Sequence, residues 1–256
     1  MGVLDGKLAL VTGASRGYGR AIAERLARDG ALVAVHYGEN ESAADATVAS
    51  IRRSGGQAFR IRAPLDGSLE SVATLFAQLD EWVAKLGRGP TIDILVNNAA
   101  ISPRGTLEDT TEAVYDEVFA VDAKAPFFIM QTAASRMPDG GRIINISSQT
   151  SLIGFPGIIA YSMAKGALDL LTIVAAKHLA PRNITVNAVL PGIADTDMNA
   201  SWLRGNAEAR KGASVFSAFG RIADVTDVAD IVGFLASNDA RWITGQLIDG
   251  GGGSGL

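Results

Sequence analysis

The chain of 256 residues contains no cysteine, which excludes disulfide bonds, thiol catalysis and thiolate metal sites. Its two histidines, His36 and His178, are too few for a histidine-rich metal site, and we expect no bound metal. With 23 basic and 27 acidic side chains, the formal charge of −4 offers no basic surface to nucleic acid or an anionic membrane. The sequence also lacks a signal peptide and any apolar run near the roughly 18 residues of a membrane span. We therefore expect a cytoplasmic protein without nucleic-acid or membrane partners.

Glycine, in contrast, is abundant: 29 of 256 residues, about 11%, against a usual share of about 7%. Apolar residues make up 48% of the chain, enough for a large buried core. No linker or internal repeat divides the sequence, so we expect one domain over residues 1–256. The excess glycine suggests that part of this domain needs close approach to its backbone.

Short apolar runs alternate with helical patterns along the chain, which predicts a doubly wound α/β fold with a parallel sheet. The expected strands are 8–12, 32–35, 58–61, 92–96, 142–146, 185–190 and 246–248. The expected helices are 18–29, 42–54, 68–86, 111–136, 158–180 and 226–237. A capping box is expected at Ser42 to Asp45, and Gly30 is expected to end the first helix. Residues 193–220 break the alternation and are expected to form a substrate lid.

The first expected strand runs directly into Thr12-Gly13-Ala14-Ser15-Arg16-Gly17-Tyr18-Gly19 and then into a helix. In a dinucleotide-binding loop, Gly13 would allow the tight turn and Gly17 the approach of a pyrophosphate. Gly19 would allow close packing of helix and sheet. The helix N-terminus would add N–H groups and a positive dipole end, so the segment predicts a site for a nicotinamide dinucleotide.

The end of the second expected strand bears on the choice between the two dinucleotides. A carboxylate there usually binds the free ribose 2′-hydroxyl of NAD, but this chain has His36-Tyr37-Gly38. Arg16 in the glycine loop suits a 2′-phosphate, so NADP is favoured. Glu39 lies just beyond and would suit NAD if the strand were longer, so NAD remains the alternative.

Tyr161 is the only tyrosine with a lysine four positions later, Lys165, and on a helix the two would share a face. An ammonium near a phenol lowers the phenol pKa, which makes Tyr161 a candidate acid or base for a carbonyl or alcohol oxygen. Ser148 follows an expected strand and could hold the same substrate oxygen. Neither histidine is placed to activate Ser148, which argues against a hydrolase of the Ser-His-Asp type.

These motifs together resemble the short-chain dehydrogenase/reductase family, in its small single-domain branch with a Rossmann-type sheet. Further matching segments are Asn97-Asn98-Ala99-Ala100, Asn187, Pro191-Gly192 with Thr196, and Thr244-Gly245-Gln246 with Asp249-Gly250-Gly251. The resemblance implies that Tyr161 is the acid/base, Ser148 orients the substrate, and Lys165 holds the nicotinamide ribose and lowers the Tyr161 pKa. The cofactor-binding residues are then expected to be Gly13, Ser15, Arg16, Gly17, Tyr18, Gly19, Tyr37, Leu65, Asn98, Ala99, Tyr161, Lys165, Pro191, Gly192, Ile193 and Thr196.

The chain departs from the family pattern at three positions. Asp122 occupies the family's fourth catalytic position, normally asparagine, and a charged Asp122 would oppose phenolate formation on Tyr161. Ala100 replaces a glycine beside the cofactor. Pro64 replaces a polar residue near the adenine, where Asp66 is a candidate substitute. We expect a working enzyme with a shifted pH profile.

The expected substrate is a small hydrophobic ketone or secondary alcohol, because most pocket candidates are apolar. These candidates are Ser102, Arg104, Ile153, Phe155, Ile158, Ile193, Met198, Trp202 and Phe216. The basic cluster Lys177, His178 and Arg182 leaves open a 3-oxoacyl-[acyl-carrier-protein] reductase. An NADP-binding sensor or scaffold with weak catalysis is an alternative of another class. By analogy with the family, Trp242 suggests subunit contacts in a homotetramer or homodimer, or else packing under the last strand.

Overall fold

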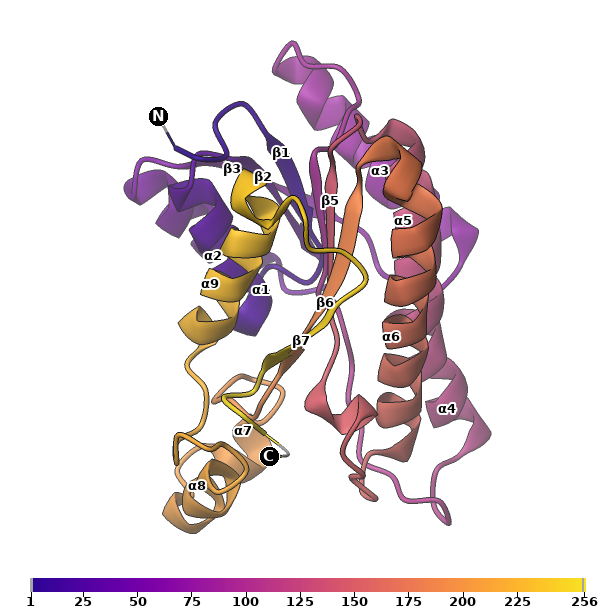
Figure 1. The fold of residues 1–256 in the computed structure, drawn as a ribbon, viewed down its shortest axis with the longest axis vertical. Coiled ribbons are helices and arrows are strands. Elements are labelled where there is room, and N and C mark those ends of the chain that lie inside the picture. The colour runs from indigo at the N-terminus through magenta and orange to yellow at the C-terminus, as the bar shows by residue number, and fades with distance from the viewer. Residues whose placement is uncertain (1, 255) are drawn as a thin grey trace.

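The computed structural model describes residues 2–254 and 256. Seven strands form one parallel sheet in the order β3-β2-β1-β4-β5-β6-β7 (Figure 1). The strands are β1 (Leu8–Val11), β2 (Leu32–Tyr37), β3 (Gln57–Arg62), β4 (Ile94–Asn97), β5 (Arg142–Ile146), β6 (Thr185–Pro191) and β7 (Leu247–Gly250). The strand order reverses between β1 and β4, which confirms the doubly wound Rossmann-type fold expected from the sequence.

Helices cover both faces of the sheet, with α1, α2 and α9 on one side and α3, α4, α5 and α6 on the other (Figure 1). The α-helices are α1 (Gly17–Arg28), α2 (Glu41–Arg53), α3 (Leu69–Lys85), α4 (Glu112–Phe119), α5 (Ala125–Arg136), α6 (Ile159–Leu179), α7 (Ala200–Leu203), α8 (Ala207–Ser214) and α9 (Val225–Ala236). Short 3₁₀ turns are η2 (Gln149–Ser151), η3 (Ala180–Arg182) and η4 (Asn238–Ala240), and η1 (Ala120–Lys124) is a π-helical turn.

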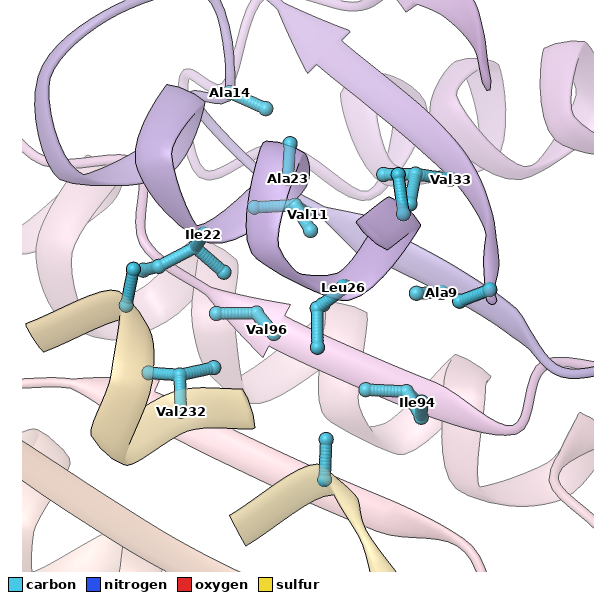
Figure 2. Close-up of a cluster of buried hydrophobic side chains, with 14 of the residues drawn as sticks. Ala9, Val11, Ala14, Ile22, Ala23, Leu26, Val33, Ile94, Val96 and Val232 are labelled. Carbon is cyan, nitrogen blue, oxygen red and sulfur yellow. The ribbon is translucent and has the colours of Figure 1, made fainter. Parts of the chain in front are cut away.

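The two faces of the sheet bury separate apolar clusters. Against α1 and α9, Ile22, Leu26 and Val232 pack on strand residues such as Val11 and Val96 (Figure 2). A second cluster fills the space between the sheet and helices α3, α5 and α6. Because the central strands are covered on both faces, they read in the sequence as continuous apolar runs.

Several local expectations are confirmed and others need correction. All seven strands exist, and Gly30 follows α1 with φ +109° as a helix-ending glycine. The capping box at Ser42 is wrong: Asn40 caps α2, accepting a hydrogen bond from the Ala43 N–H at 3.0 Å. The single helix expected over 111–136 is interrupted by the π-helical turn η1, which divides it into α4 and α5.

All strands end at the side of the sheet where α7 and α8 project, and the C-terminal segment returns to the same side (Figure 1). The expected lid segment thus contains two short helices, and a bridge joins Ala194 to Ala223 at its base. Residues Ile159–Arg182 are long and apolar enough to cross a membrane by length and composition. They form a helix of the core, however, with Leu168 and Thr172 buried toward the sheet.

Candidate active site

The glycine loop is closed by contacts with the end of β4. The Asn98 side-chain amide donates to the carbonyls of Thr12 at 2.9 Å and Gly13 at 3.1 Å. A Cβ on Gly19 would collide with the Gly13 carbonyl, and one on Gly13 would lie 2.8 Å from the Ala99 Cα. Gly13 and Gly19 are therefore required by close packing within the loop, as expected for Gly19.

Gly17 differs from these two glycines because its main chain faces open space. It has φ +55°, and an added Cβ would meet only the Thr196 side chain, at 3.5 Å. This gap lies between the start of α1, where the helix supplies unpaired N–H groups, and the start of the segment 193–220. The cradle fits a pyrophosphate, which would meet backbone on one side and Thr196 on the other.

Tyr18 connects the glycine loop to the end of β6. Its hydroxyl donates to the Gly192 carbonyl at 3.2 Å, and burial raises its pKa. Pro191 is the last residue of β6, so Gly192 and Ile193, which are expected to contact the cofactor, begin the segment that leads to α7. The structure thus brings together the two segments that were expected to hold the pyrophosphate and the nicotinamide.

His36 is a residue of this site that sequence reasoning missed. Its Nδ1 accepts from the Gly13 N–H at 3.0 Å, and its Nε2 lies 2.8 Å from the Ala63 carbonyl, to which it donates. Burial lowers the pKa of His36 to about 4, so the ring is neutral at pH 7. The signal was a histidine inside an otherwise apolar strand, a place where a polar ring needs hydrogen-bond partners.

The side chains expected near the adenosine differ in their exposure. Strand β2 runs to Tyr37, two residues further than expected, but the Tyr37 side chain is buried and its hydroxyl accepts from Arg60 at 2.8 Å. Tyr37 can therefore offer a cofactor its main chain only. Arg16 is exposed and lies 3.8 Å from Asp197 of the lid segment, while Glu39 is exposed two residues beyond β2.

Three other expected cofactor residues have local roles. The Ser15 carbonyl accepts from the Thr47 hydroxyl at 3.0 Å, which ties the loop to α2. Leu65 packs against the cluster under α3, and Ala99 donates its N–H to the Thr12 hydroxyl at 3.0 Å. Asp66, the candidate substitute near the adenine, instead accepts hydrogen bonds from Ser68 at the start of α3.

Tyr161, Lys165 and Ser148 converge at the end of β5. Tyr161 and Lys165 are both buried on the sheet-facing side of α6, with the Lys165 Nζ 5.4 Å from the centre of the Tyr161 ring. Lys165 donates to the Ile146 carbonyl at 3.1 Å. Burial raises the pKa of Tyr161, the Lys165 ammonium and a hydrogen bond with Ser148 lower it, and Asp122 raises it again.

Asp122 lies in the π-helical turn η1, which directs its side chain at Lys165. Its Oδ2 is 3.2 Å from the Lys165 Nζ, and its Oδ1 accepts from the Ile101 N–H at 2.9 Å. Side-chain exposure is 0% for Asp122 and 2% for Lys165, so the ion pair is fully withdrawn from water. Asp122 and Tyr161 together raise the pKa of Lys165 against the effect of burial, which keeps it an ammonium.

A second buried carboxyl, Asp169, lies one helical turn beyond Lys165. Among the described residues neither of its oxygens has a well-formed hydrogen bond, although Ser147 and Ser151 lie close to it. Burial raises the pKa of both Asp169 and Asp122, but only for Asp122 do Lys165, at 3.2 Å, and the Ile101 N–H oppose this rise directly. No sequence motif pointed to Asp169.

Aromatic side chains gather where the segment 193–220 meets the rest of the chain. Phe155 and Phe216 have ring centroids 5.4 Å apart, and the Arg104 guanidinium lies 5.8 Å from the centre of the Trp202 ring. Both pairs join a loop of the main body to the segment 193–220. These four of the nine pocket candidates thus form one aromatic pair and one cation–π pair.

The C-terminal segment also supports this region, through contacts that no sequence motif reveals. Gln149, next to Ser148, donates to the Leu190 carbonyl at 3.2 Å and to the Asp249 carboxylate. Asp249 in turn accepts from the N–H groups of Gly251 and Gly253. These bonds tie the end of the chain to the turn that carries Ser148.

A phenol that can pass a proton to a substrate oxygen, beside a cradle for a dinucleotide that carries hydride, defines an NAD(P)-dependent oxidoreductase for carbonyl or alcohol groups. The family model described as enoyl-(acyl carrier protein) reductase matches residues 13–254. Versicolorin reductase 1 of Aspergillus parasiticus is 39% identical over 260 residues, covering 97% of each chain. The chain belongs to the short-chain dehydrogenase/reductase family.

Two solved structures are more similar still. The reductase LugOII, which catalyses keto-reduction at C1 during lugdunomycin biosynthesis, is 51% identical with a TM-score of 0.93, covering 99% of each chain. The angucycline C-6 ketoreductase LanV, solved with bound NADP, is 49% identical with a TM-score of 0.93, covering 98% of this chain and 96% of LanV. The similarity extends over the lid segment as well as the sheet.

Proposed function

We propose that the protein reduces a ketone on a fused-ring aromatic polyketide, with NADPH as hydride donor and Tyr161 as proton donor. The observation that carries the substrate class is the pair of aromatic contacts, Phe155 with Phe216 and Arg104 with Trp202. Aromatic faces and a guanidinium suit a flat ring system with electron-rich oxygens. The similarity to LugOII and LanV supports the same class, which is narrower than the small hydrophobic ketone expected from sequence.

In this proposal the side chains at the end of β5 handle the substrate oxygen. Ser148 donates a hydrogen bond to the ketone oxygen and holds it beside Tyr161. Tyr161 donates its phenolic proton to that oxygen as negative charge develops there. NADPH, when bound, supplies the hydride. Lys165 binds the nicotinamide ribose and favours the phenolate left on Tyr161. Asp122 influences Tyr161 through its ion pair with Lys165.

The cofactor would lie across the carboxyl ends of β1, β4 and β6. The residues proposed to bind it are Gly13, Ser15, Arg16, Gly17, Tyr18, Gly19, Tyr37, Leu65, Asn98, Ala99, Tyr161, Lys165, Pro191, Gly192, Ile193 and Thr196. Arg16 would bind the 2′-phosphate, so Arg16→Ala should weaken NADPH binding about tenfold and leave NADH binding almost unchanged. Equal loss of both affinities would refute this assignment and leave NAD as the alternative.

We further propose that residues 193–220 form the substrate lid. Asp195 pairs with Arg210 at 2.6 Å and with Arg204 at 3.1 Å, which ties α7 and α8 to the base of the segment. These ion pairs are partly exposed and therefore weak, as suits a segment that opens and closes.

The substrate proposal is tested by following NADPH consumption with matched ketones. The panel is rabelomycin, which is bound with NADP in a solved structure of LanV that is 47% identical to this chain, a one-ring ketone and an acetoacetyl thioester. Each is assayed with NADPH and with NADH. Phe216→Ala should lower kcat/KM for the fused-ring ketone at least fivefold more than for the one-ring ketone. Val215→Ala, a change at an exposed neighbouring residue, serves as the control. Preference for the thioester would refute the proposal in favour of a 3-oxoacyl-[acyl-carrier-protein] reductase.

Two alternatives have weaker support. In the basic cluster, Arg182 is engaged by the Ala134 carbonyl at 2.6 Å and by Asp139 at 3.1 Å. This leaves Lys177 and His178 exposed for an acidic carrier protein. A sensor or scaffold without turnover would bind NADPH but consume none of it with any ketone.

We propose that the enzyme is a homodimer or homotetramer. Apolar side chains are exposed along α5 and α6, including Phe127, Leu170 and Val174, and Trp242 is 95% exposed rather than packed under β7. A groove of about 640 Å³ lined by α4, η1, α5 and α6 carries Asp116 of α4 and Lys124 of η1, which could pair across a two-fold axis. Sedimentation equilibrium tests this, and a monomer at micromolar concentration would refute it.

We also propose that the enzyme works in the cytoplasm, where the reduced cofactor is available. The substrate is then a small molecule, without a nucleic-acid or membrane partner. Cell fractionation that recovers the protein with membranes would contradict this location.

A further inference from the structure

The Lys165 ammonium lies 5.4 Å from the centre of the Tyr161 ring, and the carboxylate of Asp122 compensates its charge directly. The Asp122 Oδ2 lies 3.2 Å from the Lys165 Nζ, and neither side chain is exposed by more than 2%. Asp122 is fixed from the other side by the Ile101 N–H at 2.9 Å. Asp122 belongs to the π-helical turn η1, so the backbone of this turn fixes the point from which its short side chain reaches Lys165.

We propose that Asp122 is a positioning residue whose fixed negative charge cancels that of Lys165 and keeps Tyr161 a phenol to higher pH than a neutral amide would. The proposal rests on the function proposed above and deepens it, since it states when Tyr161 can act. Reduction of a ketone needs the phenol, and oxidation of an alcohol needs the phenolate. Asp122 therefore moves two pH limits toward alkaline values: the upper limit for ketone reduction and the lower limit for alcohol oxidation.

The charges around Tyr161 support this direction. From its own helix α6 it faces Lys165, and Asp169 lies one turn further. Asp122 faces it from η1, the neutral Ser148 from the end of β5, and the neutral Tyr18 from α1. Burial and Asp122 favour the phenol of Tyr161, and Lys165 and Ser148 favour the phenolate. A nearby charge in a buried site shifts a pKa by about one to three units.

Asp122→Asn removes the charge and retains an oxygen for the Ile101 N–H. We expect the alkaline limit of kcat/KM for ketone reduction to fall by about one pH unit or more. The acid limit for alcohol oxidation should fall by a similar amount. Asp122→Glu keeps the charge but also disturbs the packing, and its limits should stay near those of the wild type.

Asp169→Asn is the matched control, because it removes the other buried carboxyl near Lys165 without touching the ion pair. Its pH limits should move by much less than those of Asp122→Asn. Equal shifts of the pH limits in Asp122→Asn and Asp122→Glu would show that the effect comes from packing. A shift of the pH limits in Asp169→Asn alone would show that Asp169, and not Asp122, is the carboxyl that acts on Tyr161. Each of these results, or no shift in Asp122→Asn, overturns the proposal.

A measurement without turnover separates this proposal from the proposed function. Tyrosinate absorbance of the wild type minus that of Tyr161→Phe reports the titration of Tyr161 alone. We expect the Tyr161 phenol to persist to above pH 10, the ordinary pKa of tyrosine, in the direction in which its environment shifts it. Titration near pH 7 would overturn the role of Asp122 even if ketones are reduced. Titration above pH 10 in a protein that reduces no ketone would refute only the proposed function.

Discussion

The buried histidine under the glycine loop makes a quantitative prediction about stability and pH. The ordinary histidine pKa is 6.5, and burial lowers that of His36 to about 4 in the folded protein. In the unfolded chain the ring takes up its proton near pH 6.5, while in the folded protein it stays neutral until about pH 4. The contribution to stability is therefore complete above pH 6.5 and is lost as the pH falls toward 4. At about 1.4 kcal/mol per pKa unit, the loss is about 3 kcal/mol.

His36→Asn isolates this contribution. An asparagine oxygen can accept from the Gly13 N–H in place of Nδ1, but it does not titrate, and the bond from Nε2 to the Ala63 carbonyl is lost. We expect the variant to be less stable than the wild type by about 1 kcal/mol at pH 7.5, and the difference to shrink and then reverse toward pH 4.5.

Urea unfolding of both proteins at half-unit steps between pH 4.5 and 7.5 measures the difference. Several carboxyls also titrate at low pH, but they are common to both proteins and cancel in the comparison. His178→Asn, on the exposed end of α6, controls for the loss of a histidine. Parallel stability curves for wild type and His36→Asn over this range would refute the reasoning, because the buried ring would then not be the source of the slope.

The other predictions concern the loop, the ion pair and the basic cluster. Gly19→Ala should weaken NADPH binding at least tenfold, measured by cofactor fluorescence, because its Cβ collides with the neighbouring carbonyl of the loop. Lys165→Met should lower the free energy of unfolding by about 3 kcal/mol by leaving the Asp122 charge unpaired, and adding Asp122→Asn should restore most of it in a urea titration. Arg182→Ala should cost about 1–3 kcal/mol of stability with kcat unchanged, because its guanidinium holds the carbonyls at the end of α5.

The strands and the placement of Tyr161 beside Lys165 could be predicted because their signals are local. Strands buried on both faces appear as apolar runs, and β5 was expected at its observed bounds. Tyr161 and Lys165 were expected on one helical face, and a spacing of four residues brings them there. Strand β2 was underestimated because His36 and Tyr37 look polar in sequence, although tertiary partners bury both.

The features that could not be predicted from the sequence are contacts between residues far apart in the chain. The π-helical turn η1 has no periodic signature, so Asp122 could be suspected only from the family pattern and not from its contact with Lys165. The bond from Tyr18 to Gly192 joins residues 174 positions apart. The aromatic pairs at the lid likewise depend on how a segment without regular alternation folds back over the site.

The central claim is that Tyr161 supplies the proton as hydride reaches a ketone. The most direct test is single-turnover reduction of a fused-ring aromatic ketone with NADPH deuterated at the transferable position, in wild type and Tyr161→Phe. The wild type should place deuterium on the new carbinol carbon, and the variant should bind NADPH with similar affinity but react at least a thousandfold more slowly. Retention of the wild-type rate in Tyr161→Phe would contradict the claim.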